Sequence, residues 1–156
     1  QNKTWNWKSI VEIREKDCSL IESFQLKHKE FFGKNIWTAS EINNFITSPK
    51  NLLLMSKIKN KPVGISFFIS VNLNLEIYTI FIEKSYRNKK IGTEFLALAK
   101  KFGRKMMFDK ILLEVNEKNK TALNFYLKND FKKIGFKKGY YTSCNHENAF
   151  LMKLDI

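Results

Sequence analysis

Residues 84–90 form a short basic loop that runs from a predicted strand into a predicted helix, whose first turn contains Gly92 and Thr93. Such a junction points several backbone N–H groups at one spot, where the positive end of the helix dipole also lies. Gly92 lacks a Cβ and lets the backbone approach a bulky phosphate closely, and Thr93 adds a hydroxyl donor. The loop therefore predicts an anion-binding site, with a solvated basic loop that caps a helix as the alternative. The candidate anion-binding residues are Arg87, Asn88, Lys89, Lys90, Ile91, Gly92 and Thr93.

The loop is not one of the common nucleotide-binding motifs. The sequence contains neither the Gly-x-x-x-x-Gly-Lys-Ser/Thr of a Walker loop nor the Gly-x-Gly-x-x-Gly of a dinucleotide-binding fold. Its two cysteines, Cys18 and Cys144, lack the paired spacing of a zinc site or a thioredoxin-type site. We therefore expect two reduced thiols, no disulfide framework and no metal.

Residues 87–92, Arg-Asn-Lys-Lys-Ile-Gly, resemble a loop of the GCN5-related N-acetyltransferase (GNAT) superfamily. In that family the pattern Gln/Arg-x-x-Gly-x-Gly/Ala binds the pyrophosphate of acetyl-CoA. The family places this loop between its fourth strand and the following long helix, which is also its place here. Lys90 departs from the pattern, because it stands where the first Gly is usual.

Residues 112–131 resemble the RimI-like branch of the superfamily, the ribosomal-protein alanine N-acetyltransferases. The branch has the pattern Leu-Glu-Val, Asn-x-x-Ala-x-x-x-Tyr and Gly-Phe, and Glu114, Asn119 and Tyr126 match its spacing. The similarity continues in residues 76–82, 139–141 and 147–149, and it covers about residues 8–155. The departures are Asn116 for Arg, Asp130 for Gly and Phe81 for a small residue.

The resemblance implies acetyl-CoA as the co-substrate, Glu114 as the general base and Tyr126 as the general acid. It implies that the strand residues Ile80, Phe81 and Ile82 hold the pantetheine arm, provided that a bulge or a splay leaves their N–H groups unpaired. The remaining residues that it implies are Asn119 for a cofactor amide, and Glu76, Tyr140 and Tyr141 for the acceptor, although the two tyrosines could instead plug the sheet.

The chemistry of acyl transfer fits the two catalytic candidates. The reaction needs a neutral amine, a base for its proton and a proton for the departing thiolate. Glu114 alternates away from Leu113 and Val115 on its strand, and partial desolvation would make it a better base. A phenol such as Tyr126 stays protonated, but full transfer to a thiolate of pKa about 8.5 is uphill by about 2 kcal/mol. An α-amine of pKa about 7.7–8.0 is roughly a tenth neutral near pH 7, so a modest base suffices for a protein N-terminus.

Each of these side chains also has a purely structural interpretation. Glu114 could be a carboxylate of the strand ladder, Tyr126 a core aromatic residue and Asn119 a helix N-cap. Of the two histidines, His28 is expected to be a solvated helix residue. His146 lies in a late loop and could line the acceptor site.

The elements that must position these residues alternate between strands and helices. This order fits a mixed α/β sheet covered by helices, in a single domain of residues 1–156. The resemblance implies the GNAT fold, a mixed, mostly antiparallel twisted sheet of about seven strands flanked by about four helices. The predicted elements are strand 9–14, helix 17–30, a helix from Ser40, strands 52–58, 63–70 and 76–83, helix 91–106, strand 110–116, helix 119–128, and strands 131–137 and 148–154.

The composition limits the partners. The 156 residues carry 28 Lys+Arg against 15 Asp+Glu, a net charge of +13, but only 3 of the cations are Arg. Base-reading proteins rely on Arg, and a codon bias that also enriches Asn, Ile and Phe can supply Lys, so direct nucleic-acid binding is not expected. No apolar run approaches the roughly 20 residues of a membrane span, and the polar start has no signal-peptide core. We expect a cytoplasmic protein without a membrane partner.

The sequence thus predicts an acetyl-CoA-dependent N-acetyltransferase whose acceptor is the N-terminal amine, most simply of Ala, of a ribosomal protein. One alternative is a GNAT enzyme that acts on a small-molecule amine or on a protein lysine. The other alternative is a non-catalytic module that keeps the fold and binds the ribosome or RNA. Coenzyme A binding separates the enzymes from that module.

Overall fold

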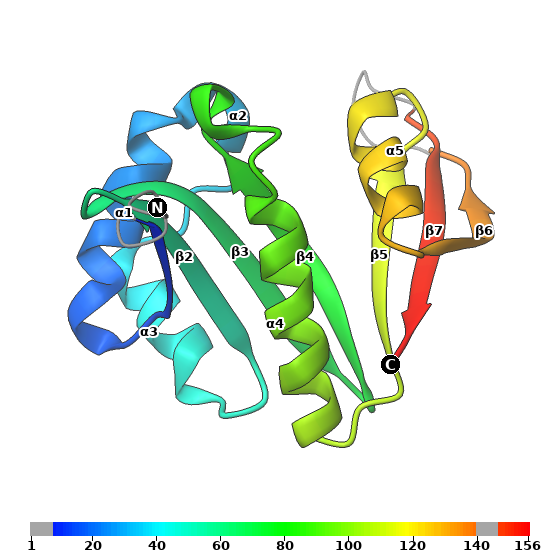
Figure 1. Cartoon of the computed structure of the whole chain (residues 1–156), viewed down its shortest axis with the longest axis horizontal. Coiled ribbons are helices and arrows are strands. Elements are labelled where there is room, and N and C mark those ends of the chain that lie inside the picture. Colours follow the sequence, from blue (N-terminus) through cyan, green and yellow to red (C-terminus); the bar gives the residue numbers. More distant parts are fainter. Residues whose placement is uncertain (1–7, 140–146) are drawn as a thin grey trace, which may run out of the picture.

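The computed structural model describes residues 8–139 and 147–156, which form one twisted sheet with helices on both faces (Figure 1). The strands are β1 (Lys8–Glu12), β2 (Leu52–Ile58), β3 (Lys61–Val71), β4 (Asn74–Ile82), β5 (Lys110–Asn116), β6 (Lys132–Lys137) and β7 (Ala149–Asp155). The helices are α1 (Cys18–Lys27), α2 (Lys29–Phe32), α3 (Ala39–Thr47), α4 (Ile91–Lys105) and α5 (Lys120–Lys128), with two 3₁₀ turns, η2 (Glu15–Asp17) and η3 (Lys84–Tyr86).

The strand order across the sheet is β1-β2-β3-β4-β5-β7-β6. Every neighbouring pair is antiparallel except β4 and β5, which are parallel. Their ladder covers only three residue pairs, from Asn74 opposite Lys110 to Glu76 opposite Leu112. Beyond Glu76 the two strands separate, and Figure 1 shows the β5, β7 and β6 arm diverging from the rest of the sheet.

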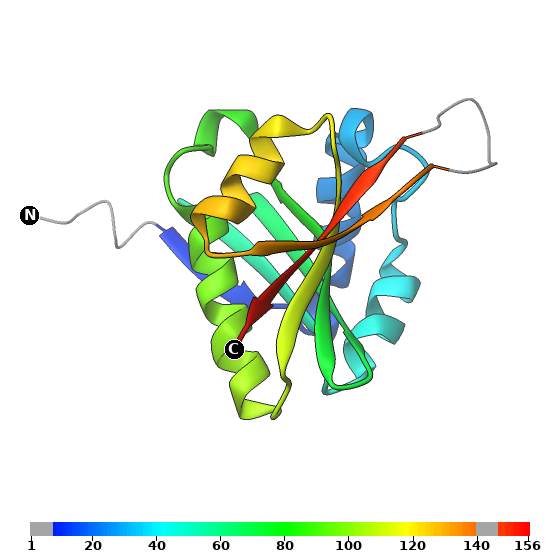
Figure 2. The same cartoon turned by 90° about the vertical axis from the view of Figure 1, so that its right-hand side faces the viewer.

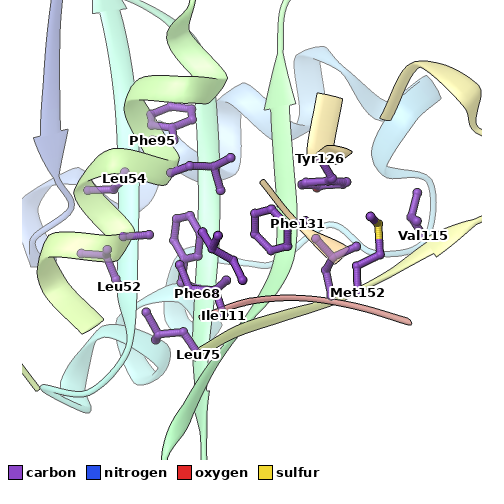
Figure 3. Packing of buried hydrophobic residues seen from close by; sticks show 14 of the residues in the cluster. Leu52, Leu54, Phe68, Leu75, Phe95, Ile111, Val115, Tyr126, Phe131 and Met152 are labelled. Atoms are coloured by element: carbon purple, nitrogen blue, oxygen red, sulfur yellow. The ribbon is translucent and has the colours of Figure 1, made fainter. Parts of the chain in front are cut away.

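The two faces of the sheet each bury a hydrophobic cluster. Because successive strand residues point to opposite faces, Leu52 and Leu54 of β2 pack with α4 and α5, whereas Leu53 and Met55 pack with α1, α2 and α3. Figure 3 shows the first cluster, in which side chains of β5, β7 and α5 continue the core from beneath α4 into the arm. The arm is therefore packed onto the rest of the domain by its own apolar face.

The predicted fold class is confirmed, and the element order agrees with the prediction within one or two residues at most boundaries. The helix predicted for residues 17–30 is interrupted at His28, so five α-helices occur among the described residues where about four were expected. The cap of α3 is Thr38 rather than Ser40, since Thr38 Oγ1 accepts from the N–H of Glu41 and the Glu41 carboxylate accepts from Thr38. None of the helices in the described ranges is long and apolar enough to cross a membrane.

Candidate active site

The fork between β4 and β5 is the central feature of the site. Residues of β4 beyond Glu76 have no partner strand on the β5 side within the described residues. A bulge adds to the divergence, because Phe67 of β3 lies opposite Thr79 and Phe68 lies opposite Ile77, which leaves Tyr78 as the extra residue. Residues 80–82 remain paired with β3, and the bulge lies before them at Tyr78. The splay alone therefore opens the β5 side of residues 80–82, which is the condition set by the sequence.

The basic loop ends at the N-terminus of α4 in an unusual backbone conformation. Lys90 has φ 64° and ψ 14°, and Asn88 has φ 62°, so both are left-handed. Lys90 makes no side-chain cap, and the first helical bond runs from the N–H of Glu94 to the Lys90 carbonyl. The three N–H groups of residues 91–93 therefore find no acceptor among the described residues. Lys90 occupies the position where the family pattern has Gly, and its left-handed backbone conformation is one that Gly adopts without strain.

Gly92 proves necessary for a reason that the sequence did not reveal. A Cβ at Gly92 would lie 2.8 Å from Cζ of Phe125 and 3.5 Å from Cδ1 of Ile82. The missing side chain lets α5 pack tightly against the first turn of α4, so Gly92 fixes helix packing as well as leaving the N–H groups accessible. Arg87 is also tied down, because its Nε donates to the Ile82 carbonyl at 2.9 Å and its guanidinium lies 5.8 Å from the centre of the Phe81 ring.

Glu114 lies on the open face of β5. Leu113 and Val115 point into the core beneath α4 and α5, so Glu114, opposite Leu151 of β7, points to the other face. Its side chain is 52% exposed, and its Oε1 accepts from Nζ of Lys137 on β6 at 3.3 Å. The partial desolvation that we expected from its apolar neighbours is therefore small, because both neighbours turn the opposite way.

Tyr126 lies on the opposite face of β5 from Glu114. Its ring is 8% exposed and packs edge-on against Phe125 at 5.2 Å and Phe131 at 5.4 Å (Figure 3). Burial raises the pKa of Tyr126 to about 12, so the phenol remains protonated across the whole neutral range. The hydroxyl has no hydrogen-bond partner within the described residues, which leaves it available to a ligand.

Of the other predicted residues, two lie within the described residues and three lie outside them. Asn119 caps α5, with its Oδ1 accepting from the N–H of Ala122 at 3.1 Å, and its amide nitrogen has no partner among the described residues. Glu76 lies at the closed end of the fork, opposite Leu112. Tyr140, Tyr141 and His146 fall in residues 140–146, outside the described residues.

His28 is not the solvated helix residue that we expected. Its side chain is only 21% exposed, and its Nε2 lies 2.7 Å from Oε2 of Glu83 at the end of β4. The imidazole also packs between the rings of Phe24 at 4.8 Å and Phe81 at 4.9 Å. The lysines on either side of His28 disguise this position in the sequence, and nothing local marks Glu83 as its partner. The contact ties the α1–α2 junction to the strand that leads into the basic loop.

A mixed sheet that forks between two parallel strands, with an open helix N-terminus beside the fork, is the architecture of an acyl-CoA N-acyltransferase. The model of the acetyltransferase (GNAT) family matches residues 7–131. The chain belongs to this family and is an N-acetyltransferase, as the sequence predicted. No curated protein sequence matches the chain significantly.

Solved structures give the same fold at low identity. A GNAT-family acetyltransferase from Streptococcus pneumoniae is 20% identical over 96% of this chain and 99% of its own, with a TM-score of 0.80. The ribosomal-protein-S18-alanine N-acetyltransferase of Escherichia coli is 18% identical over 96% and 94%, with a TM-score of 0.74. A structure from Bacillus anthracis, described as a streptothricin acetyltransferase in complex with acetyl coenzyme A, is 25% identical over 73% and 67%, with a TM-score of 0.68.

Proposed function

We propose that this protein transfers the acetyl group of acetyl-CoA to the N-terminal α-amine of a protein, with the N-terminal Ala of a ribosomal protein as the acceptor. The observation that carries the proposal is the placement of Glu114 and Tyr126 on opposite faces of β5, beside a fork that opens next to unpaired N–H groups. Amine and thioester can then approach each other through the fork, with a base on one side and an acid on the other.

The cofactor is held by backbone groups in this proposal. The pyrophosphate accepts from the N–H groups of residues 91–93, and the exposed Lys89 and Lys90 contribute charge. The pantetheine arm lies along the unpaired edge of β4 at residues 80–82, and the free amide nitrogen of Asn119 donates to it. Arg87 positions the loop through the bond from its Nε to the Ile82 carbonyl, and its guanidinium adds positive charge beside the pyrophosphate.

Glu114 takes the proton of the amine, directly or through a water, while the amine nitrogen attacks the thioester carbonyl and the C–S bond breaks. Because the Glu114 side chain is 52% exposed, it is open to an acceptor from solvent, and an acceptor that is already partly neutral needs the least help from it. An α-amine of pKa about 7.7–8.0 meets that requirement, whereas a lysine of pKa about 10.4 does not. The exposure of Glu114 thus favours an N-terminus over a lysine side chain.

Tyr126 stabilises the departing thiolate by a hydrogen bond. With a pKa of about 12, it is a weaker acid than a thiol of pKa about 8.5 by roughly 3.5 units, or about 5 kcal/mol. Complete proton transfer from the phenol is therefore unfavourable, and the thiolate takes its proton from solvent after release. A donor in a buried, low-dielectric position still lowers the barrier, because its hydrogen bond strengthens as charge develops on sulfur.

A peptide panel tests the acceptor. Peptides that differ only in their first residue are incubated with acetyl-CoA beside an N-blocked peptide with internal lysines, spermidine and streptothricin, and mass spectrometry locates the acetyl group. We expect acetylation at the α-amine, fastest with Ala. Modification of spermidine or streptothricin alone would indicate a small-molecule acceptor, the alternative that the similarity to the streptothricin acetyltransferase favours. Acetylation of internal lysines would overturn the argument from the exposure of Glu114.

Glu114→Gln tests the base. We expect acetyl-CoA to raise the melting temperature of this variant as it does that of the wild type, while turnover falls by about 10²-fold or more. Glu12→Gln is the matched control, since Glu12 is also an exposed strand carboxylate but lies on β1 at the far edge of the sheet. If coenzyme A does not stabilise the wild type, the catalytic proposal fails and the non-catalytic module remains.

A further inference from the structure

The positive charge of the protein is concentrated in its second half. Residues 1–83 carry 11 Lys and Arg against 8 Asp and Glu, a net charge of +3, whereas residues 84–156 carry 17 against 7, a net charge of +10. The acidic residues are thus divided almost evenly, and the cations are not. A codon bias that acts on the whole chain would enrich Lys in both halves, so the uneven distribution calls for a local explanation.

Four of these cations, Lys84, Arg87, Lys89 and Lys90, belong to the basic loop. Further exposed cations lie on α4, on and just before α5, and on β6. Phe95, Leu96 and Ala99 turn one side of α4 toward the sheet, and the cations that follow at helical spacing point away from it. Figure 1 shows α4 and α5 on the same side of the sheet, and Figure 2 shows β6 running beside α5. We call the following exposed residues the basic face: Lys101, Arg104, Lys105, Lys118, Lys120, Lys128 and Lys133. Lys133 lies opposite Met152 on the α4 and α5 side of the arm, whereas its neighbour Lys132 lies opposite Lys153 and points to the other side.

The cations of the basic face are not neutralised by the domain itself. The salt bridges among the described residues pair Lys27, His28, Lys137 and Lys153, and none involves a member of the basic face. Cations in the last turn of a helix stabilise its dipole, which accounts for Arg104, Lys105 and Lys128. It does not account for Lys118 and Lys120 at the start of α5, where a cation is unfavourable.

We propose that the basic face docks on the phosphate backbone of RNA. Of the 17 cations in residues 84–156, 15 are Lys, which contact phosphates as point charges and read no base edges. A face that extends over two helices and an edge strand suits a polyphosphate rather than a single phosphate. A second copy of this chain is disfavoured because two basic faces repel each other. The total charge and the low Arg content led us to expect no direct nucleic-acid binding. The concentration of the positive charge in the second half of the chain is the observation that favours RNA.

The position of the basic face is compatible with catalysis. The basic face lies with α4 and α5 on one side of the sheet, whereas Glu114 points to the other side. Bound RNA would therefore leave the acceptor side of the fork open. The choice of RNA over DNA rests on the proposed function, because that function names a ribosomal acceptor. The proposal that the basic face binds phosphates does not depend on the acceptor.

Fluorescence anisotropy with a labelled 20-nucleotide oligouridine RNA tests the proposal, at 50 to 200 mM NaCl. Saturating coenzyme A is present throughout, so that the basic loop is occupied and its lysines do not contribute. Three proteins are compared: the wild type, the variant Lys101→Gln/Lys105→Gln/Lys128→Gln, and the control Lys16→Gln/Lys34→Gln/Lys50→Gln. All six lysines are exposed, and both variants lose the same charge.

We expect the wild type to bind RNA with an affinity that falls as salt rises. The basic-face variant should bind at least tenfold more weakly at 50 mM NaCl, and the slope of log affinity against log salt should decrease by about 2, from three contacts at about 0.7 each. The control should stay within about twofold of the wild type. Equal losses in the two variants, or no binding by the wild type, would overturn the proposal.

Three further arms identify the partner class. Tighter binding to polyglutamate or to phosphatidylglycerol vesicles than to RNA at the same salt would assign the basic face to an acidic protein or to a membrane and overturn the proposal. Tighter binding to duplex DNA would overturn the choice of RNA. The rise in melting temperature caused by acetyl-CoA is measured on the wild type and on both variants. If acetyl-CoA does not stabilise the wild type, the enzymatic proposal fails and the RNA proposal does not. If the slope of RNA affinity against salt is the same in the wild type and the basic-face variant, the RNA proposal fails and the enzymatic proposal does not.

Discussion

Replacing Lys90 by Gly should stabilise the protein. Lys90 is held at φ 64° and ψ 14°, where a residue with a Cβ is strained by about 1–2 kcal/mol. Glycine removes that strain but has more freedom in the unfolded chain, which costs about 0.4–1 kcal/mol. The difference leaves a gain of about 0.5–1 kcal/mol in the free energy of unfolding. For a chain of 156 residues this corresponds to a rise in melting temperature of about 2 °C.

Lys89→Gly is the matched control. It removes the same charge from the same loop and introduces the same freedom, but Lys89 is not left-handed, so no strain is relieved. We expect it to lower the free energy of unfolding by about 0.5–1 kcal/mol. Urea denaturation and thermal unfolding of both variants at one salt concentration give the comparison. If Lys89→Gly is as stable as Lys90→Gly, the reasoning from the left-handed backbone is refuted and only the loss of charge matters.

Three other variants test contacts around the fork. Gly92→Ala should cost about 1–3 kcal/mol, because its Cβ would lie 2.8 Å from the Phe125 ring, and Phe125→Leu should restore part of that loss in urea denaturation of the double variant. His28→Ala should cost about 1–3 kcal/mol by removing the 2.7 Å partner of a largely buried Glu83, and His28→Gln should recover some of it; an unchanged midpoint would contradict the contact. Tyr126 has a pKa raised by burial from 10.0 to about 12, so its contribution is full below pH 10 and is lost as the pH rises to 12. Between pH 9 and pH 12, Tyr126→Phe should therefore lose about 2 kcal/mol less stability than the wild type, and parallel pH profiles would contradict the burial of the phenol.

Strands and helices with a strong apolar period could be predicted from the sequence. The runs in β2 and β3 bury both faces, and α4 has a wide apolar stripe, so their types and bounds followed from composition and spacing. The burial of His28 at the break between α1 and α2 could not be predicted, because its partner Glu83 lies 55 residues away. The cap at Thr38 could have been found, since Thr38-Ala-Ser-Glu41 is a capping-box sequence.

The candidate site was only partly predictable. Spacing along the chain indicated Glu114 and Tyr126, but it could not tell that they lie on opposite faces of β5, since that depends on where α5 packs. The apolar neighbours of Glu114 suggested a desolvated base, but both neighbours point to the opposite face and the Glu114 side chain is 52% exposed. The left-handed backbone at Lys90 was hidden because Lys carries no sign of positive φ, unlike the Gly that the family pattern has there.

One packing contact unites the two ends of the proposed cofactor site. Phe125 fills the space left by Gly92 at the N-terminus of α4, and the next residue, Tyr126, carries the candidate acid. Any shift of α5 that moves the phenol must therefore also move the ring that presses on the first turn of α4. The pyrophosphate and the thioester would then be positioned by a single packed unit. Glu114 stands outside that unit on the exposed face of β5. In the proposed mechanism, a change of acceptor would therefore leave the cofactor undisturbed.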